Sequence, residues 1–261
     1  MPTSPVPGGP CTVSAGEGTE RRRYRAEGGG VLTDAHARLA LFQLADSAFP
    51  AGLFAFSHGL ETAVQDGSVA DATSLESFVG DWLAWTVGPG DATFVASAHR
   101  AATEGDVATL ADLAAWAHAS RLPREGRAAA ARPGARMAAL AVKLMGETTG
   151  AVALRALVAR REPLPYSVAF GAAAAAFGCD APSAVLASLH GAASGLLGAA
   201  LRLMKVDHEQ TQSILRHLAP VMTAIASDSL AADWRESRPG HVRFDACQMR
   251  HETAHVRLFM S

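Results

Sequence analysis

The spacing of apolar residues is the feature that most constrains the fold of this chain. From Asp34 onward, apolar side chains recur at three- and four-residue steps, as in Leu75, Phe78, Val79 and Trp82. That spacing places them on one face of a helix. No segment alternates with a period of two, and no hairpin dipeptide separates runs of β-branched residues. The pattern therefore predicts an all-α fold, a single-domain helical bundle of about eight to ten helices.

Glycine and proline suggest where several of these helices end. Gly88-Pro89-Gly90 is expected to end one helix, after which Asp91 would cap the next. Pro133-Gly134 is expected to divide an arginine-rich segment into separate or kinked helices. Further helices are predicted at about 149–161, 166–177, 183–205 and 209–227.

The two ends of the chain differ from this helical part. Residues 1–33 are predicted to be a disordered extension, since they are rich in proline and glycine and lack an apolar run of signal-peptide length. Residues 34–228 form the predicted helical domain. Residues 229–261 lack clear periodicity and include Pro239-Gly240, so we expect an extended C-terminal partner-binding tail with one short helical turn.

Composition excludes several classes of protein. Hydrophobic residues make up 49% and the net charge is −2, so the chain is neither wholly disordered nor charged like a nucleic-acid-binding protein. Its three cysteines are scattered, which excludes a disulfide scaffold. Charged residues are only 18%, and alanine and glycine are abundant. This predicts closely packed helices and a buried partner surface.

Residues 184–204 are long enough to span a membrane. Gly191, Gly195 and Gly198 would form a helix-contact face in lipid, but the same small residues let helices approach closely inside a bundle. His190 lies within the segment, and the chain has only one such span. We therefore favour a helix at the centre of the bundle and no membrane partner.

An HExxH string, His251-Glu252-Thr253-Ala254-His255, is the strongest catalytic pattern. On a helix, two such histidines can bind zinc while the glutamate acts as a base. The six residues that follow contain no third ligand, which argues against a zinc hydrolase. A metal-binding pair, His251 and His255, is an alternative; a partner-contacting tail is the favoured interpretation.

Other catalytic motifs are missing from the sequence. It contains no GxxxxGK[ST] phosphate loop and no GxSxG nucleophile elbow. No strand followed by GxGxxG is predicted either. The chain is therefore not expected to hydrolyse nucleotides by itself in the P-loop manner, and no cofactor is expected.

Two motifs lie near the ends of the helical part. The first reads Leu41-Phe42-Gln43-Leu44-Ala45-Asp46-Ser47-Ala48-Phe49-Pro50, then Gly52 and Ser57-His58-Gly59-Leu60-Glu61. The second reads Met249-Arg250-His251-Glu252-Thr253, then Arg257-Leu258-Phe259 and Ser261. In these motifs the chain resembles the UreF family of urease accessory proteins, over residues 38–261 or so.

The resemblance implies an all-helical, homodimeric, cytoplasmic protein without catalytic activity. Such a protein bridges a second accessory protein, UreD or UreH, and the GTPase UreG, and so regulates GTP-dependent nickel insertion into apo-urease. One departure from the family lies at Lys205–Gln212, where only Gln212 of the expected pattern is kept. This could alter the GTPase contact or its regulation.

Ten residues are the candidates for partner binding. The tail supplies an aromatic and aliphatic anchor beside forked cations, a combination favoured at binding hot spots. Arg202 and Gln212 are candidates for the GTPase-facing or dimer region. The candidates are Ser57, Glu61, Arg202, Gln212, Arg250, His251, Glu252, Arg257, Leu258 and Phe259. The alternative function is a direct nickel or zinc carrier that uses His251 and His255, with His241 or His208.

Overall fold

A computed structural model describes residues 31–260, in which the chain forms helices and no strand. The all-α class is confirmed, with twelve α-helices within residues 31–260 where about eight to ten were expected. Residues 1–30 of the predicted extension lie outside the described residues, and the first helix begins at Val31. The helices are α1 (Val31–Ala45), α2 (Leu60–Gln65), α3 (Ala72–Trp82), α4 (Thr93–Glu104), α5 (Val107–Ala119), α6 (Arg124–Leu144), α7 (Thr149–Ala159), α8 (Tyr166–Ala176), α9 (Ala181–Leu203), α10 (His208–His217), α11 (Ala219–Ala231) and α12 (Val242–Glu252). Short 3-10 turns are η1 (Leu53–Ala55) and η3 (Trp234–Glu236), and η2 (Leu83–Ala92) is a π-helix.

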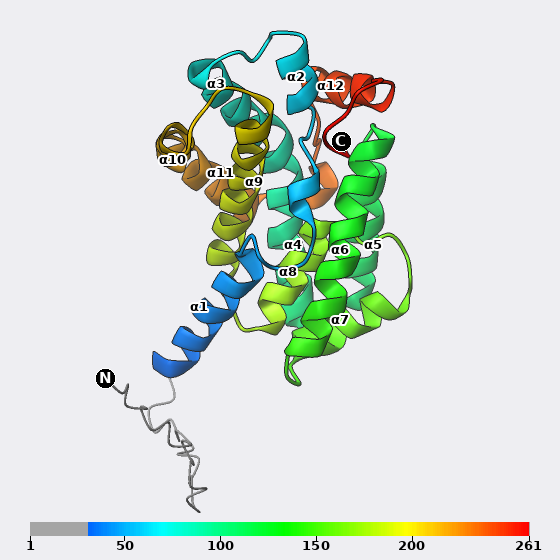
Figure 1. Ribbon diagram of the computed structural model, residues 1–261. Coiled ribbons are helices and arrows are strands. Elements are labelled where there is room, and N and C mark those ends of the chain that lie inside the picture. The colour runs from blue at the N-terminus through cyan, green and yellow to red at the C-terminus, as the bar shows by residue number, and fades with distance from the viewer. Residues whose placement is uncertain (1–30, 261) are drawn as a thin grey trace, which may run out of the picture.

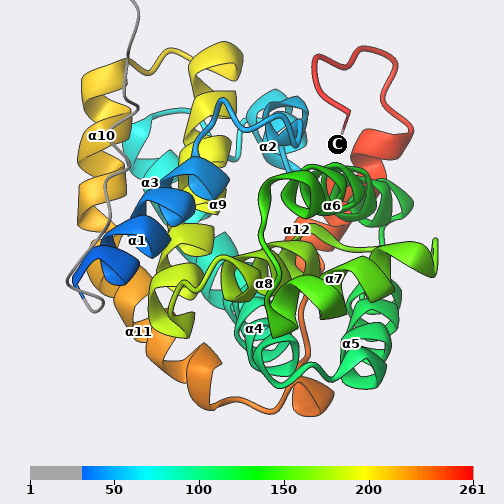
Figure 2. The same cartoon turned by 90° about the horizontal axis from the view of Figure 1, so that it is seen from below.

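The alanine-rich helix α8 lies at the centre of the bundle. It packs against α4, α6, α7 and α9, which surround it in Figures 1 and 2. Gly171 allows α8 to approach α4 closely, because a Cβ atom there would lie 2.4 Å from the carbonyl oxygen of Val95 on α4. The abundance of small residues therefore reflects close helix packing, as the composition predicted.

Helix α9 is the one described helix long and apolar enough to cross a membrane by length and composition. It packs against α1, α4, α8 and α11 within the bundle. These contacts place α9 in the bundle, but the close approach expected at its glycines is wrong, because added Cβ atoms at Gly191, Gly195 and Gly198 would meet nothing within 4 Å.

The expected break at Gly88-Pro89-Gly90 was wrong. Helix α3 continues through η2 directly into α4. Thr93 and Ser229 donate side-chain hydrogen bonds to the carbonyl oxygen of Gly88, at 3.0 and 3.2 Å. Pro89 itself lies inside η2, where the chain continues as a π-helix, so the helix does not end there. Asp91 lies inside η2 and pairs with Arg121, so it is not a helix cap.

Two other helix boundaries differ from the sequence pattern. Helix α6 runs unbroken through Pro133, so the arginine-rich segment is not divided into separate helices. Residues 209–227, predicted as one helix, belong to α10 and α11, which meet at Leu218 because Pro220 has no N–H to continue the hydrogen bonds of α10.

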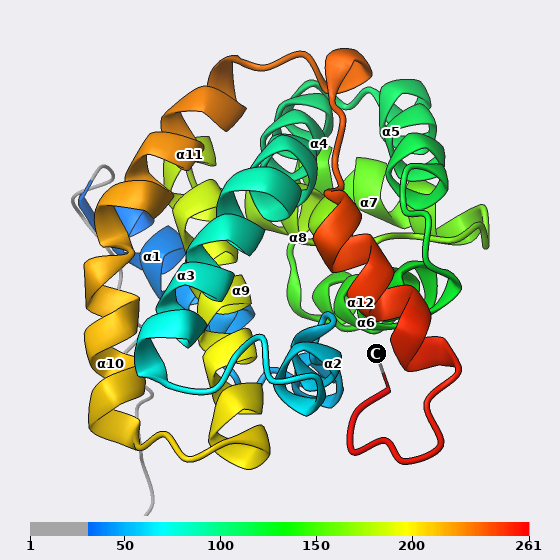
Figure 3. The ribbon, with the colours of Figure 1, turned by 90° about the horizontal axis from the view of Figure 1, so that it is seen from above.

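The C-terminal part is more ordered than an extended tail with one short turn. Residues 242–252 form α12, with Phe244, Cys247, Gln248 and His251 on its buried face. Two of these four inward residues are polar, which explains why apolar periodicity missed the helix. Figure 3 shows α12 on the side of α2 and α6, with the following chain turning back toward them and away from α10.

Candidate partner-binding site

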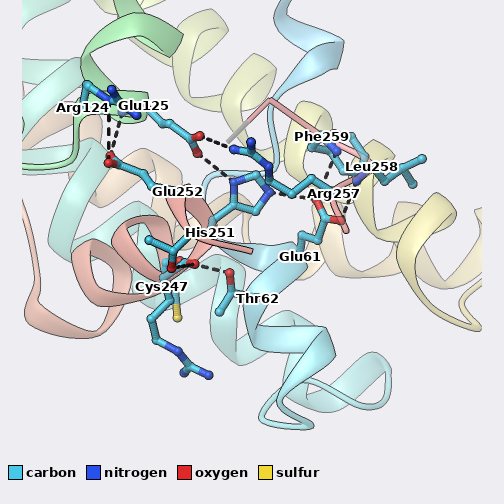
Figure 4. A network of polar contacts seen from close by, with 12 residues as sticks. Glu61, Thr62, Arg124, Glu125, Cys247, His251, Glu252, Arg257, Leu258 and Phe259 are labelled. Atoms are coloured by element: carbon cyan, nitrogen blue, oxygen red, sulfur yellow. Dashed lines mark hydrogen bonds and ion pairs between the residues drawn. The ribbon is translucent and has the colours of Figure 1, made fainter. Parts of the chain in front are cut away.

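The last described residues, 253–260, form an extended segment that we call the arm. Its backbone is bound by one side chain, Glu61 of α2, which is only 2% exposed. The carboxylate of Glu61 accepts hydrogen bonds from the N–H groups of Leu258 at 2.7 Å and Phe259 at 3.1 Å. Figure 4 shows Glu61 between these two residues and His251. One buried carboxylate therefore fixes two successive peptide groups of the arm.

His251 of α12 lies between two carboxylates and has no exposed surface. Its Nε2 is 3.0 Å from Glu61 Oε2, and its Nδ1 is 2.8 Å from Glu125 Oε2 on α6. A carboxylate only accepts, and a neutral imidazole has a single N–H. The arrangement therefore needs one further proton, carried by the imidazole or by one of the two carboxyl groups.

Arg257 completes this cluster. Its Nη1 lies 2.6 Å from Glu125 Oε1, so that glutamate joins the arm to α12. We call Glu61, Glu125, His251 and Arg257 the clasp. Glu125 therefore contacts both a buried imidazole and a guanidinium that is 40% exposed, so the clasp reaches from the interior to the surface.

The start of α6 is tied to the end of α12 by a second contact. The N–H of Glu125 donates to Glu252 at 3.0 Å, and Arg124 lies 3.8 Å from the same carboxylate. A carboxylate at a helix N-terminus satisfies an otherwise unpaired N–H and interacts favourably with the helix dipole. Glu252 therefore supports the position of Glu125 within the clasp.

Burial and hydrogen bonding act in opposite directions on the pKa of Glu61. Burial of the carboxyl group favours its neutral form, but hydrogen bonds from the Leu258 N–H, His251 and the Phe259 N–H outweigh it. The pKa of Glu61 consequently lies below its usual value, which keeps this carboxylate ionised while the arm is bound.

The tip of the arm connects α9 to η1. The guanidinium of Arg202, on α9, lies 4.2 Å from the centre of the buried Phe259 ring, a cation–π contact. The same guanidinium donates to the carbonyl oxygen of Phe54 at 2.8 Å. The N–H of Met260 donates to the carbonyl oxygen of Ala55 at 2.9 Å. The arm therefore holds η1 against the end of α9.

The outer side of the arm is apolar and accessible. Val256 is 79% and Leu258 is 62% exposed, and the Arg257 side chain between them is 40% exposed although it pairs with Glu125. Arg250 extends the basic character of this surface and pairs with Asp66 at 2.9 Å. Exposed apolar side chains held on an ordered backbone and flanked by arginines suit a protein partner.

Seven of the ten predicted partner-binding residues meet at this site. They are Glu61, Arg202, His251, Glu252, Arg257, Leu258 and Phe259. Arg250 lies at its edge, and Ser57 is buried in the segment before α2. Gln212 is exposed on α10, which lies away from the arm in Figure 3.

Sequence reasoning missed Glu125. An acidic residue in the first turn of a helix is common and stabilises the helix by itself, so nothing marked Glu125 as part of a tertiary cluster. The carbonyl groups of Phe54 and Ala55, which accept hydrogen bonds at the tip of the arm, were also missed. Every residue has a backbone carbonyl group, so the sequence does not mark these two.

The HExxH string does not form a helical metal pair. Helix α12 ends at Glu252, so His255 lies beyond the helix and is exposed, while both nitrogens of His251 face carboxylates. Between residues 31 and 260, no group of three or more histidine, cysteine, aspartate or glutamate side chains is placed to hold a metal ion. His208 and His241 lie at the first turn of α10 and the N-terminal cap of α12, outside the clasp.

Comparison with known proteins identifies the family. The UreF family model matches residues 69–219, the central helices between the two terminal motifs. Urease accessory protein UreF of Cereibacter sphaeroides (strain ATCC 17025) is 38% identical over 224 residues, which is 85% of this chain and 98% of that protein. Proteins of the same name from Xanthobacter autotrophicus and Bradyrhizobium sp. (strain BTAi1) are 34% and 33% identical; they align with 90% and 82% of this chain and over 96% and 88% of their own lengths. This chain belongs to the UreF family of urease accessory proteins.

Proposed function

We propose that this protein is a non-enzymatic scaffold of urease maturation. It bridges a UreD/UreH-like accessory protein and the GTPase UreG, and it regulates GTP-dependent nickel insertion into apo-urease. Family membership supports the general role. The observation that carries the specific role is the arm, whose backbone is fixed by a buried clasp while Val256 and Leu258 are presented outward.

The arm is the proposed contact for the UreD/UreH-like protein. An ordered segment loses less conformational entropy on binding than a free tail does. Leu258 provides an apolar anchor, and Arg250 and Arg257 provide forked cations beside it. Arginine is one of the residue types enriched at binding hot spots, and the leucine adds apolar area to the contact.

The remaining partners are assigned to other surfaces. Gln212, exposed on α10, is proposed for the GTPase-facing or dimer region. Exposed Leu39 and Phe42 on α1 support the proposed homodimer, because large apolar side chains on one helix face favour association. The assembly is proposed to act in the cytoplasm.

The test changes the outer side of the arm and leaves the clasp intact. The variant Val256→Asp/Leu258→Asp keeps the Leu258 N–H that Glu61 binds. We expect it to bind the purified UreD/UreH-like protein more than about tenfold more weakly. The matched control is Val152→Asp on α7, which also introduces an acid at an exposed valine, 58% accessible.

The proposal also predicts what nucleotide assays will show. The isolated chain should not hydrolyse GTP, whereas adding it with the UreD/UreH-like protein should change GTP turnover by UreG. Unchanged binding of the double variant, with its helical circular dichroism intact, would remove the arm from the proposed interface.

A further inference from the structure

A cavity of about 700 Å³ lies inside the bundle, beside the region that the arm holds. Its walls come from α3, η2, α8 and α9, with aromatic side chains that include Phe56, Trp82 and Phe170. The π-helix η2 contributes Thr86, Val87 and Asp91. π-Helical segments are rare and occur frequently at functional sites.

Three polar atoms of residues that line this cavity lack partners in the described part of the chain. They are Ser167 Oγ, Thr86 Oγ1 and Arg121 Nε, all buried. Ser167 is only 1% exposed. Buried donors usually find a hydrogen-bond partner, and a cavity with space and several polar groups can provide one by admitting small polar molecules.

The cavity reaches the surface between two segments. Its exposed lining residues all belong to residues 46–54 and to α9; they are Asp46, Ser47, Leu53, Phe54, His190, Gly195 and Arg202. One side of this opening therefore consists of η1 and the residues before it, and the other side consists of α9.

Segment η1 is weakly anchored within the bundle. It is three residues long and none of them is buried. The arm makes two of the contacts that hold η1. The Met260 N–H donates to the carbonyl oxygen of Ala55. Phe259 contacts the Arg202 guanidinium, which in turn donates to the carbonyl oxygen of Phe54. Loss of the arm would remove the first contact and weaken the second.

We propose that the arm is a strap that holds η1 against α9 and thereby limits the access of small polar solutes to the cavity. Release of the arm frees η1, and the opening widens. The strap itself does not depend on the proposed function. Its regulatory consequence does, because a UreD/UreH-like partner that takes up the arm would then open the cavity.

The strap is tested by a reporter thiol inside the cavity. Ser167→Cys places it where the native hydroxyl lacks a partner, in the full-length chain. Iodoacetamide labelling is followed thiol by thiol by peptide mass spectrometry. Cys179 is the internal control, because it is buried and its thiol contacts Ala37 of α1, away from the arm.

Removing residues 253–261 should raise the labelling rate at position 167 by about tenfold, because a cation–π contact and a hydrogen bond that hold η1 are lost. Phe259→Ala, which leaves the chain at full length, should raise it by a smaller factor of about three. The rate at Cys179 should stay unchanged in both variants.

An unchanged rate at position 167 would overturn the strap, and so would an equal increase at Cys179, which would report general loosening of the bundle. The same samples distinguish the strap from the proposed role of the arm as an interface. Loss of partner binding with unchanged labelling overturns the strap alone. Faster labelling at position 167 with undiminished partner binding supports the strap and overturns the proposed role of the arm as an interface.

Discussion

His251 and Glu61 lie 190 positions apart in the sequence, yet the imidazole Nε2 and the carboxylate Oε2 are 3.0 Å apart and fully enclosed. They belong to the two terminal motifs by which the chain resembles its family. The motifs are therefore two halves of one site, in which α2 binds both the end of α12 and the arm that follows it. Glu125, from a third region of the chain, completes that site.

Replacing His251 should destabilise the protein strongly. His251→Ala leaves the Glu61 and Glu125 carboxylates buried and without the group that separates them. We expect the free energy of unfolding in urea to fall by about 3 kcal/mol, the range found when one partner of a buried ion pair is removed. His255→Ala, at an exposed position four residues on, should change it by less than about 0.5 kcal/mol. Equal effects of the two substitutions would refute a structural role for the clasp.

Acid should release the arm. The pKa of Glu61 is lower with the arm bound than in a solvated carboxyl group. Ionised Glu61 therefore stabilises the bound arm above its usual pKa, about 4.3, and this contribution is lost as the pH falls through the lower, bound value. Protection factors of the Leu258 and Phe259 amides in hydrogen exchange should fall over that range.

A substitution tests the origin of this effect. Glu61→Gln keeps only one carbonyl oxygen, and its NH2 group would face the second arm amide, so at least one of the two amides should be poorly protected already at neutral pH. Glu147→Gln, at an exposed glutamate, should behave like the native protein. Full protection of both amides in Glu61→Gln would show that the carboxylate does not hold the arm.

Apolar periodicity predicted the helices whose inward faces are apolar. The segment predicted at 183–205 is α9, Ala181–Leu203, and the segment predicted at 166–177 is α8, Tyr166–Ala176. It failed for α12, because Gln248 and His251 occupy inward positions. Polar groups can take such positions only when tertiary partners satisfy them, and those partners are distant in sequence.

Glycine and proline gave a wrong helix boundary where neighbouring segments pack closely against the helix. Gly88 and Gly90 sit against Ile225 and Pro239, at 2.9 and 2.6 Å from the position of an added Cβ atom. They are small because neighbouring chain segments approach closely there, rather than because a helix ends. Six residues of the site belong to the two terminal motifs, whereas Glu125 was visible only through the distances to its partners.

His58 should make the stability of the fold sensitive to acid. Burial lowers the pKa of His58 to about 4, although Asp91 opposes the shift. Between that value and the ordinary 6.5, the unfolded chain binds a proton that the folded chain does not, so stability falls as the pH falls. The slope from this group approaches about 1.4 kcal/mol per pH unit.

The variant His58→Asn removes the titrating group while keeping a residue that tolerates the positive φ of 51° at this position. Urea unfolding between pH 4 and 6.5 should then show a shallower dependence on pH, with His255→Asn as the control for an exposed histidine. An unchanged slope in His58→Asn would mean that His58 is protonated in the folded protein.

Two helix-interior glycines should respond to alanine in opposite directions. At Gly134 of α6, an added Cβ atom would lie 2.0 Å from the carbonyl oxygen of Leu164, so Gly134→Ala must displace backbone and should cost about 1–3 kcal/mol. At Gly191 of α9, an added Cβ atom meets nothing within 4 Å. Gly191→Ala should therefore stabilise the helix, by up to about 1 kcal/mol, through propensity alone. Thermal unfolding of the two variants measures the change in stability that each substitution causes. A stabilising effect of Gly134→Ala would contradict the close contact between α6 and the segment before α8.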